Sequence, residues 1–331
     1  MRGSASHIIL LLFAGIMGIG AHSPYNGSGP NEEAFKADDG EHNALEYILP
    51  SAARSGVIPF TRAGNLIIIQ ATVDSVTGNF ILDTGAPGLV LNLTYFRYYK
   101  PSARPDSEGG GITGGTKGAS PVEVAKLSFG GFDFMKVHAH RLGLGHIENQ
   151  KGIKILGLLG AGLFKRFEMI IDHSNDVIYL ARAGHRDRQV TSHFSLKENA
   201  SFRTFPIKYL DKKVVIQLYA GKHKLNFVLD TGAETNVIDS RLPSHIMENV
   251  SIERKITLVG TGNRRIEAWY GKMKNLFLID EPLGDQDFLV TSLKDMSAAF
   301  GRDIDGMLGY EFLSKQMIGF NFLTNQMYLW K

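Results

Sequence analysis

Apolar residues along the chain gather in short runs that are either β-branched or alternate with polar residues. Four runs carry this signal most clearly: 66–69, 122–129, 132–137 and 214–218. Turn-forming pairs such as Gly130-Gly131 and Thr324-Asn325 punctuate the chain, as is typical between strands. Beyond residue 56, helical signals are confined to three short segments: 161–167, 292–300 and 310–316. One more short helix is indicated at 41–48. The pattern therefore predicts an all-β protein with little room for helical crossovers.

The second half of the chain repeats the first. Residues 80–86 read FILDTGA and residues 227–233 read FVLDTGA. A second pair follows in the same order, GLLG at 157–160 and GMLG at 306–309. The match then continues without a gap in two closing segments: 168–180 and 317–329. Ordered matches of this kind indicate a duplicated unit, so we expect two similar lobes.

These patterns predict five segments. They are a signal peptide at 1–21, a polar leader or propeptide at 22–56, an N-terminal lobe at 57–182, an interlobe linker at 183–203 and a C-terminal lobe at 204–331. The composition of the leader, rich in Gly, Asn, Asp and Glu, leaves open whether it is a propeptide or a spacer.

The N-terminus has the pattern of an export signal. Arg2 precedes an apolar run at 8–21 that ends in small residues. As a helix this run would span about 21 Å, which is shorter than a bilayer crossing requires. We expect a cleavable signal peptide and a secreted or periplasmic protein without stable membrane insertion. The alternative is a protein anchored in the membrane by residues 8–21.

Charge and cysteine content exclude several classes of function. The 36 basic and 33 acidic residues nearly cancel, so there is no concentrated basic field to bind nucleic acid. The chain has no cysteine, which excludes disulfides, thiolate catalysis and iron–sulfur clusters.

Each copy of the repeat places an aspartate at the end of an apolar strand, Asp83 in the first and Asp230 in the second. A carboxylate there is costly unless it is hydrogen-bonded or functional. A pseudo-twofold axis between the lobes would bring the two aspartates together. Two adjacent carboxylates share a proton, so that one can activate water while the other polarises a carbonyl.

The duplicated Asp-Thr-Gly-Ala motif, each copy followed by two apolar residues and Gly, resembles the aspartic peptidases. It is similar in particular to bacterial retropepsin-like aspartyl proteases, over residues 57–331. The resemblance implies two β-barrel-like lobes of the acid-protease fold with an active-site cleft between them. It also implies that Asp83 and Asp230 are the catalytic dyad, since aspartic proteases are themselves the standard example of the shared proton.

The resemblance further assigns supporting residues. Threonines would cross-link the two active-site loops and glycines would shape them: Thr84, Gly85 and Ala86 in one loop, Thr231, Gly232 and Ala233 in the other. Apolar-apolar-Gly strands would lie behind the loops: Leu158, Leu159 and Gly160, and Met307, Leu308 and Gly309. Glycine-rich flaps would close over substrate: Gly110, Gly111, Gly114 and Gly115 in the first, Gly260, Thr261 and Gly262 in the second.

Several positions depart from the pepsin-like pattern. Ala86 and Ala233 replace residues that usually carry a hydroxyl, which removes a hydrogen bond that lowers the pKa of a carboxylate. We therefore expect a pH optimum less acidic than that of a gastric enzyme. Pro87 and Glu234 break the symmetry after the motifs. We expect Glu234 to point into solvent; the alternative is that it adds a third negative charge near the two aspartates.

The sequence thus predicts an aspartic endopeptidase that works as a monomer with two lobes and needs no metal or organic cofactor. Its partner would be a peptide or protein substrate in extended conformation, held in β fashion. The alternatives are a non-catalytic peptide-binding module on the same fold, and a protease of narrow specificity that processes itself or one partner.

Overall fold

The computed structural model describes residues 54–101, 110–111, 114–115, 120–183, 201–210, 213–259 and 265–331. The expected signal peptide, the leader up to residue 53, most of the expected linker and the second glycine-rich tip at 260–262 lie outside these ranges. Within the described ranges, no helix is both long and apolar enough to cross a membrane.

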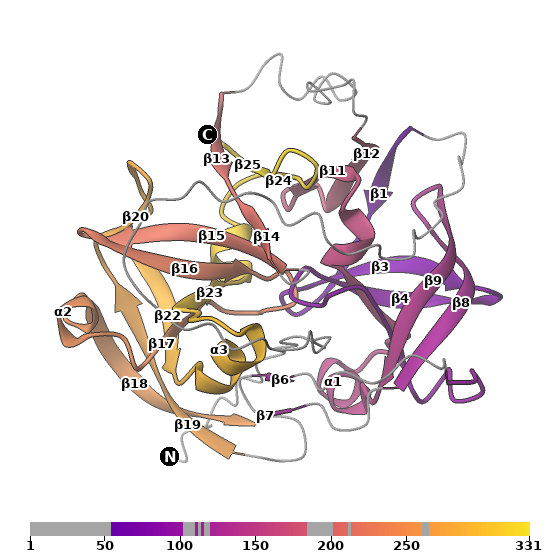
Figure 1. The fold of residues 1–331 in the computed structure, drawn as a ribbon, viewed down its shortest axis with the longest axis horizontal. Helices are drawn as coiled ribbons and strands as arrows, with labels where there is room; N and C mark the ends of the chain where they lie inside the picture. Colours follow the sequence, from indigo (N-terminus) through magenta and orange to yellow (C-terminus); the bar gives the residue numbers. More distant parts are fainter. Residues whose placement is uncertain are drawn as a thin grey trace, which may run out of the picture.

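The chain folds into two β lobes and a sheet that both halves share (Figure 1). The N-terminal lobe consists of β2 (Thr61–Ala63), β3 (Leu66–Val73), β4 (Val76–Asp83), β5 (Leu89–Asn92), β8 (Ser120–Phe129), β9 (Phe132–Leu142) and β10 (Gly157–Gly160). The four strand runs expected from the sequence fall within β3, β8, β9 and β15, and the all-β prediction is confirmed.

The C-terminal lobe repeats this arrangement. It consists of β14 (Lys208–Leu210), β15 (Lys213–Ala220), β16 (His223–Leu229), β17 (Val237–Asp239), β18 (Val250–Val259), β19 (Arg265–Met273), β20 (Leu276–Leu278), β21 (Glu281–Pro282), β22 (Gln286–Thr291) and β23 (Gly306–Leu308). The strand order β3-β4-β10-β5-β9-β8 of one lobe corresponds to β15-β16-β23-β17-β22-β19 of the other.

The two lobes close differently. In the N-terminal lobe β3 also pairs with β8, so the sheet curls into a closed barrel. In the C-terminal lobe β15 instead pairs with β20, and β20 continues to β21. β20 takes the place of the end of β8, since Tyr219 pairs with Phe277 where Thr72 pairs with Ser128 in the other lobe. Residues 274 and 275 interrupt the strand between β19 and β20, and this sheet is a curled half-barrel.

A six-stranded antiparallel sheet joins the lobes. It contains β1 (Ser55–Pro59), β11 (Phe167–Asp172), β12 (Val177–Arg182), β13 (Phe202–Pro206), β24 (Ile318–Asn321) and β25 (Gln326–Trp330). Its seam is the pairing of β11 with β24, the closing segments of the two repeats. The β11–β12 hairpin of the first repeat and the β24–β25 hairpin of the second belong to this one sheet. The sheet therefore fixes the two lobes to each other, along the upper side of Figure 1.

Helices are few and short in the described ranges. They are α1 (Gly145–Lys151), the 3₁₀ helix η1 (Ala161–Phe164), α2 (Ser244–Met247), α3 (Lys294–Phe300) and α4 (Tyr310–Leu313). The expected helices at 161–167 and 310–316 are shorter than predicted, because the chain soon enters β11 and β24. The sequence patterns gave no signal for α1 or α2. Both α1 and α3 end before a glycine with positive φ, Gly152 and Gly301, which is a common helix stop.

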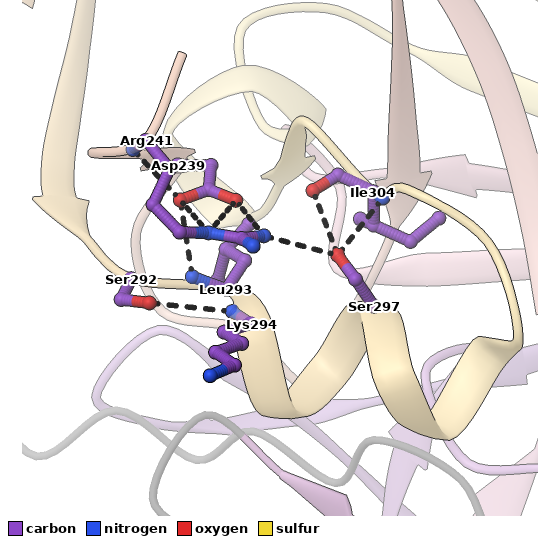
Figure 2. Close-up of polar contacts among 7 residues, drawn as sticks. All are labelled: Asp239, Arg241, Ser292, Leu293, Lys294, Ser297 and Ile304. Atoms are coloured by element: carbon purple, nitrogen blue, oxygen red, sulfur yellow. Dashed lines mark hydrogen bonds and ion pairs between the residues drawn. The ribbon is translucent and has the colours of Figure 1, made fainter.

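Equivalent polar residues hold α1 and α3 against their lobes. In the C-terminal lobe Asp239 accepts hydrogen bonds from Arg241 and from the backbone N–H of Leu293 (Figure 2). Ser297 on α3 then accepts from the backbone N–H of Ile304 at 3.1 Å. In the N-terminal lobe Asn92 stands in the place of Asp239 and accepts a hydrogen bond from the Leu144 N–H. Glu148 on α1 stands in the place of Ser297 and accepts from the Ile155 N–H.

Candidate active site

The two aspartates stand at the ends of equivalent strands and meet between the lobes. Asp83 is the last residue of β4 and Asp230 follows β16 directly. Both are almost completely buried, at 2% and 1% exposed. Each carboxyl group lies against the glycine of the opposite motif, Asp83 against Gly232 and Asp230 against Gly85, so the two carboxyl groups meet at the lobe interface. The structure therefore brings together the pair that the repeat singled out.

Threonines cross-link the two loops symmetrically. The Thr84 hydroxyl donates to the Leu229 carbonyl at 2.8 Å and accepts from the Thr231 N–H at 3.0 Å. The Thr231 hydroxyl donates to the Leu82 carbonyl at 2.8 Å and accepts from the Thr84 N–H at 3.0 Å. Each loop is thus held by the opposite lobe through buried hydrogen bonds, which fixes the separation of the aspartates.

The glycines of the two motifs make room for the carboxyl groups. A Cβ on Gly85 would lie 2.5 Å from Cγ of Asp230, and one on Gly232 would lie 2.6 Å from Cγ of Asp83. Real side chains do not approach this closely, so any larger residue would displace the opposite carboxyl group. Glycine is required here for a close approach between the lobes.

Backbone donors and burial set the charge state of the dyad. Asp83 accepts from the Ala86 N–H at 3.0 Å and Asp230 accepts from the Gly232 N–H at 2.8 Å. Burial, followed by the charge of Asp230, raises the pKa of Asp83 well above its usual value. Burial raises the pKa of Asp230 to about 6, while the Gly232 N–H and the neighbouring Asp83 side chain oppose that rise. The dyad therefore keeps one proton across a wide range of pH.

Ala86 and Ala233 sit behind the dyad with their methyl groups in apolar clusters, and both are fully buried. Their N–H groups close the loops by donating to the Asp83 and Asp230 carbonyls. No hydroxyl occupies either position, as the sequence indicates.

The apolar-apolar-Gly segments form strands beside the dyad. β10 runs parallel to β4, with Leu158 opposite Ile81 and Gly160 opposite Asp83. β23 runs parallel to β16 in the same way, and Met307 and Leu308 are buried. A Cβ on Gly160 would lie 2.5 Å from the Ala86 carbonyl, and one on Gly309 2.5 Å from the Ala233 carbonyl. These glycines let the active-site loops pack directly on the following chain.

The first glycine-rich segment forms a small hairpin. β6 (Gly110–Gly111) pairs antiparallel with β7 (Gly114–Gly115), and β6 lies against α3 of the opposite lobe. Figure 1 places this hairpin between α1 and α3. In the C-terminal lobe the corresponding hairpin is formed by β18 and β19, whose tip carries Gly260, Thr261 and Gly262 and lies outside the described residues. The role of both hairpins as flaps remains a prediction.

The expectation that Glu234 points into solvent is wrong. Its side chain is 14% exposed and forms an ion pair of 2.5 Å with Lys151, which is 8% exposed. It also accepts a hydrogen bond from the Asn65 N–H of the N-terminal lobe. Sequence reasoning overlooked this pair because Lys151 and Glu234 come from different lobes and no local pattern links them.

A second residue that motif reasoning overlooked is Lys213, at the start of β15. It is 1% exposed, although lysine is rarely buried to this degree. A signal was present in the sequence. When Asp83 is aligned on Asp230, Lys213 takes the place of the apolar Leu66 in an otherwise apolar strand.

Comparison with known protein families agrees with this architecture. The family model described as aspartyl protease matches residues 69–163 and 215–312, one match in each lobe. The chain therefore belongs to the aspartyl protease family, a family of peptidases and thus of hydrolases. The two matched regions contain Asp83 and Asp230, respectively. A search of curated proteins finds no match to the chain.

Proposed function

We propose that this protein is an aspartic endopeptidase in which Asp83 and Asp230 activate a water molecule for attack on a peptide bond. The observation that carries the proposal is the pair of buried carboxyl groups, each in contact with the glycine of the opposite motif. Family membership supports peptidase activity but does not by itself identify the reacting residues.

In the proposed reaction the ionised carboxylate takes a proton from water as the oxygen attacks the scissile carbonyl carbon. The protonated carboxyl donates its proton to the carbonyl oxygen, giving a tetrahedral diol. The diol collapses when the carboxyl group that took the proton from water donates it to the leaving amine nitrogen. The C–N bond breaks, and a diol hydroxyl gives its proton to the other carboxylate as the carboxylic acid product forms. The dyad ends with the single proton with which it began.

We further propose that the substrate binds in extended conformation between the lobes, in β fashion, to the single two-lobed chain. Both aspartates and both threonine cross-links come from one polypeptide, so a second chain is not needed to complete the site. The protein would act outside the cytoplasm if residues 1–21 direct export as the sequence predicts.

The test is cleavage of a diverse peptide pool by residues 22–331 between pH 3 and pH 8. Asp83→Asn and Asp230→Asn should each reduce kcat/KM by at least about 10³-fold, and a statine-type inhibitor should block cleavage. Asp172→Asn is the matched control. Asp172 also ends a buried strand, but it accepts turn hydrogen bonds from Ser174 and Asn175, as its repeat counterpart Asn321 does in the other half.

Asp172→Asn should leave kcat/KM within about two-fold of the wild type, because asparagine can accept the same turn hydrogen bonds. Cleavage that survives both dyad substitutions would overturn the proposal. A wild-type protein that binds peptides without cleaving them would instead support the peptide-binding module. Cleavage confined to the leader at 22–56 would support a self-processing protease.

A further inference from the structure

When the two repeats are aligned without a gap, one buried position near the dyad carries an apolar residue in one lobe and a basic residue in the other. With Asp83 aligned on Asp230, residues 66–82 align on residues 213–229, and Leu66 corresponds to Lys213. Leu66 is fully buried in an apolar cluster that includes Ile147 of α1. Lys213 is buried to the same degree in the equivalent place. A cation therefore occupies one lobe where the other has a hydrocarbon side chain.

Lys213 and Asp230 lie two residues beyond the end of the β15–β16 pairing, on the face of the sheet that Val215 and Val228 share. In the N-terminal lobe the pairing of β3 with β4 ends with Ile68 opposite Ile81, so Leu66 and Asp83 stand in the same relation. Successive side chains of a strand point to opposite faces of the sheet, so residues two positions apart share a face.

The surroundings of Lys213 keep its ammonium group out of bulk water. Its Nζ lies 4.4 Å from the centre of the Phe300 ring on α3, a favourable cation–π geometry. The charged residues of α3, Lys294 and Asp295, lie at exposed positions. A buried charge acts more strongly on its neighbours than an exposed one because solvent screens it less.

Two titratable side chains act on Asp230, Asp83 across the lobe interface and, with a weaker effect on its pKa than burial and the hydrogen bonds, the positive charge of Lys213 at the start of β15. Behind the same loop, Glu311 of α4 accepts hydrogen bonds from Thr235 and from the Asn236 N–H. The positive charge of Lys213 lowers the pKa of Asp230. Burial and then the negative charge of Asp230 raise the pKa of Asp83.

We propose that Lys213 is a positioning residue that holds the negative charge of the dyad on Asp230 and leaves the shared proton on Asp83. The inference rests on the proposed function and makes it specific. Asp230 is then the base that takes a proton from water, and Asp83 is the acid that donates its proton to the scissile carbonyl oxygen. The pseudo-twofold symmetry alone would leave these two roles undecided.

The experiment compares Lys213→Met with Leu66→Met, which places the same side chain at both equivalent positions. Methionine is close to lysine and leucine in volume, and thermal unfolding verifies that both variants fold. Carboxyl signals of protein labelled at Asp Cγ are titrated by NMR and assigned with Asp83→Asn and Asp230→Asn. Lys213→Gln, which keeps a polar group of similar length, serves if the methionine variant does not fold.

In the wild type the Asp230 signal should titrate at lower pH than the Asp83 signal. Lys213→Met should raise the Asp230 midpoint by at least about one pH unit, because it removes a nearby opposite charge. The acid limb of kcat/KM should move to higher pH by the same amount, since the base must be ionised. Leu66→Met should leave both midpoints within about 0.3 units of the wild type.

An Asp230 midpoint that does not move in Lys213→Met, or a wild type in which Asp83 ionises first, would overturn the inference. The NMR titration does not depend on peptide cleavage. A protein that cleaves nothing but shows the expected titrations would therefore refute the proposed function while leaving the role of Lys213 intact. A protein that cleaves through both aspartates but shows no shift would do the opposite.

Discussion

The two lobes share the geometry of their active-site loops but not the charges around them. Each loop has the same threonine cross-link and the same glycine against the opposite carboxyl group. In the N-terminal lobe Leu66 begins β3 and Lys151 ends α1. At the equivalent positions of the C-terminal lobe, Lys213 begins β15 and Phe300 ends α3. Each lobe thus has one lysine in this place, on the helix in the N-terminal lobe and on the strand in the C-terminal lobe.

The difference separates two kinds of constraint. Loop geometry depends on contacts that cross the interface in both directions, so a change in one lobe must be matched in the other. The buried lysines act on near neighbours only, so their positions can differ between the two lobes. Lys151 binds Glu234 and joins the lobes, whereas Lys213 stands just beyond the β15–β16 pairing, on the side of Asp230, where we propose that it acts on the dyad. In a dimer of identical lobes, symmetry would give both aspartates the same surroundings.

The largest expected effect comes from breaking the ion pair between Lys151 of the N-terminal lobe and Glu234 of the C-terminal lobe. Lys151→Met leaves the Glu234 carboxylate without its cation in a nearly dry site, and should reduce the free energy of unfolding by about 3–5 kcal/mol. Lys126→Met is the control, because the Lys126–Asp133 pair is largely exposed and should contribute about 1 kcal/mol or less. Urea denaturation measures both, and equal losses would refute the distinction.

The next effect tests the symmetry of the loops. Gly85→Ala and Gly232→Ala each push a methyl group against the opposite carboxyl group, so both should reduce kcat/KM by about 100-fold or more. Gly88→Ala in the same region is the control, because a Cβ there meets nothing within 4 Å. The two variants should lose comparable activity. A large loss in one and none in the other would show that the lobes do not contribute equally.

A smaller effect is expected from the threonine cross-link. Thr84→Val and Thr231→Val each remove a buried hydroxyl and leave a carbonyl and an N–H without their partner across the interface. Each should cost about 1–3 kcal/mol of stability. The double variant should cost less than the sum, because both hydroxyls belong to one network. Thermal and urea unfolding test this, and strict additivity would contradict a shared network.

Much of the fold could be predicted from the sequence because the signals are local and occur twice. Alternation and β-branched runs at 66–69 and 132–137 reflect strands with one buried face, whose period is set by backbone geometry. The paired Asp-Thr-Gly segments indicated both the duplication and the residues that meet at the interface. Helix ends were predicted less well, because the packing of the following strand decides where η1 and α4 stop.

The sequence by itself determined the class of fold, the duplication and the identity of the candidate dyad, since each follows from residue type and spacing along the chain. Only the tertiary structure decided the surroundings of those residues. Glu234 was expected in solvent, yet Lys151 and Asn65 of the other lobe enclose it. The proposed role of Lys213 depends on its burial against Phe300 and on strand pairing, which puts it on the same face of the sheet as Asp230. Electrostatic effects depend on distance in space and on burial, and neither is a local property of the chain.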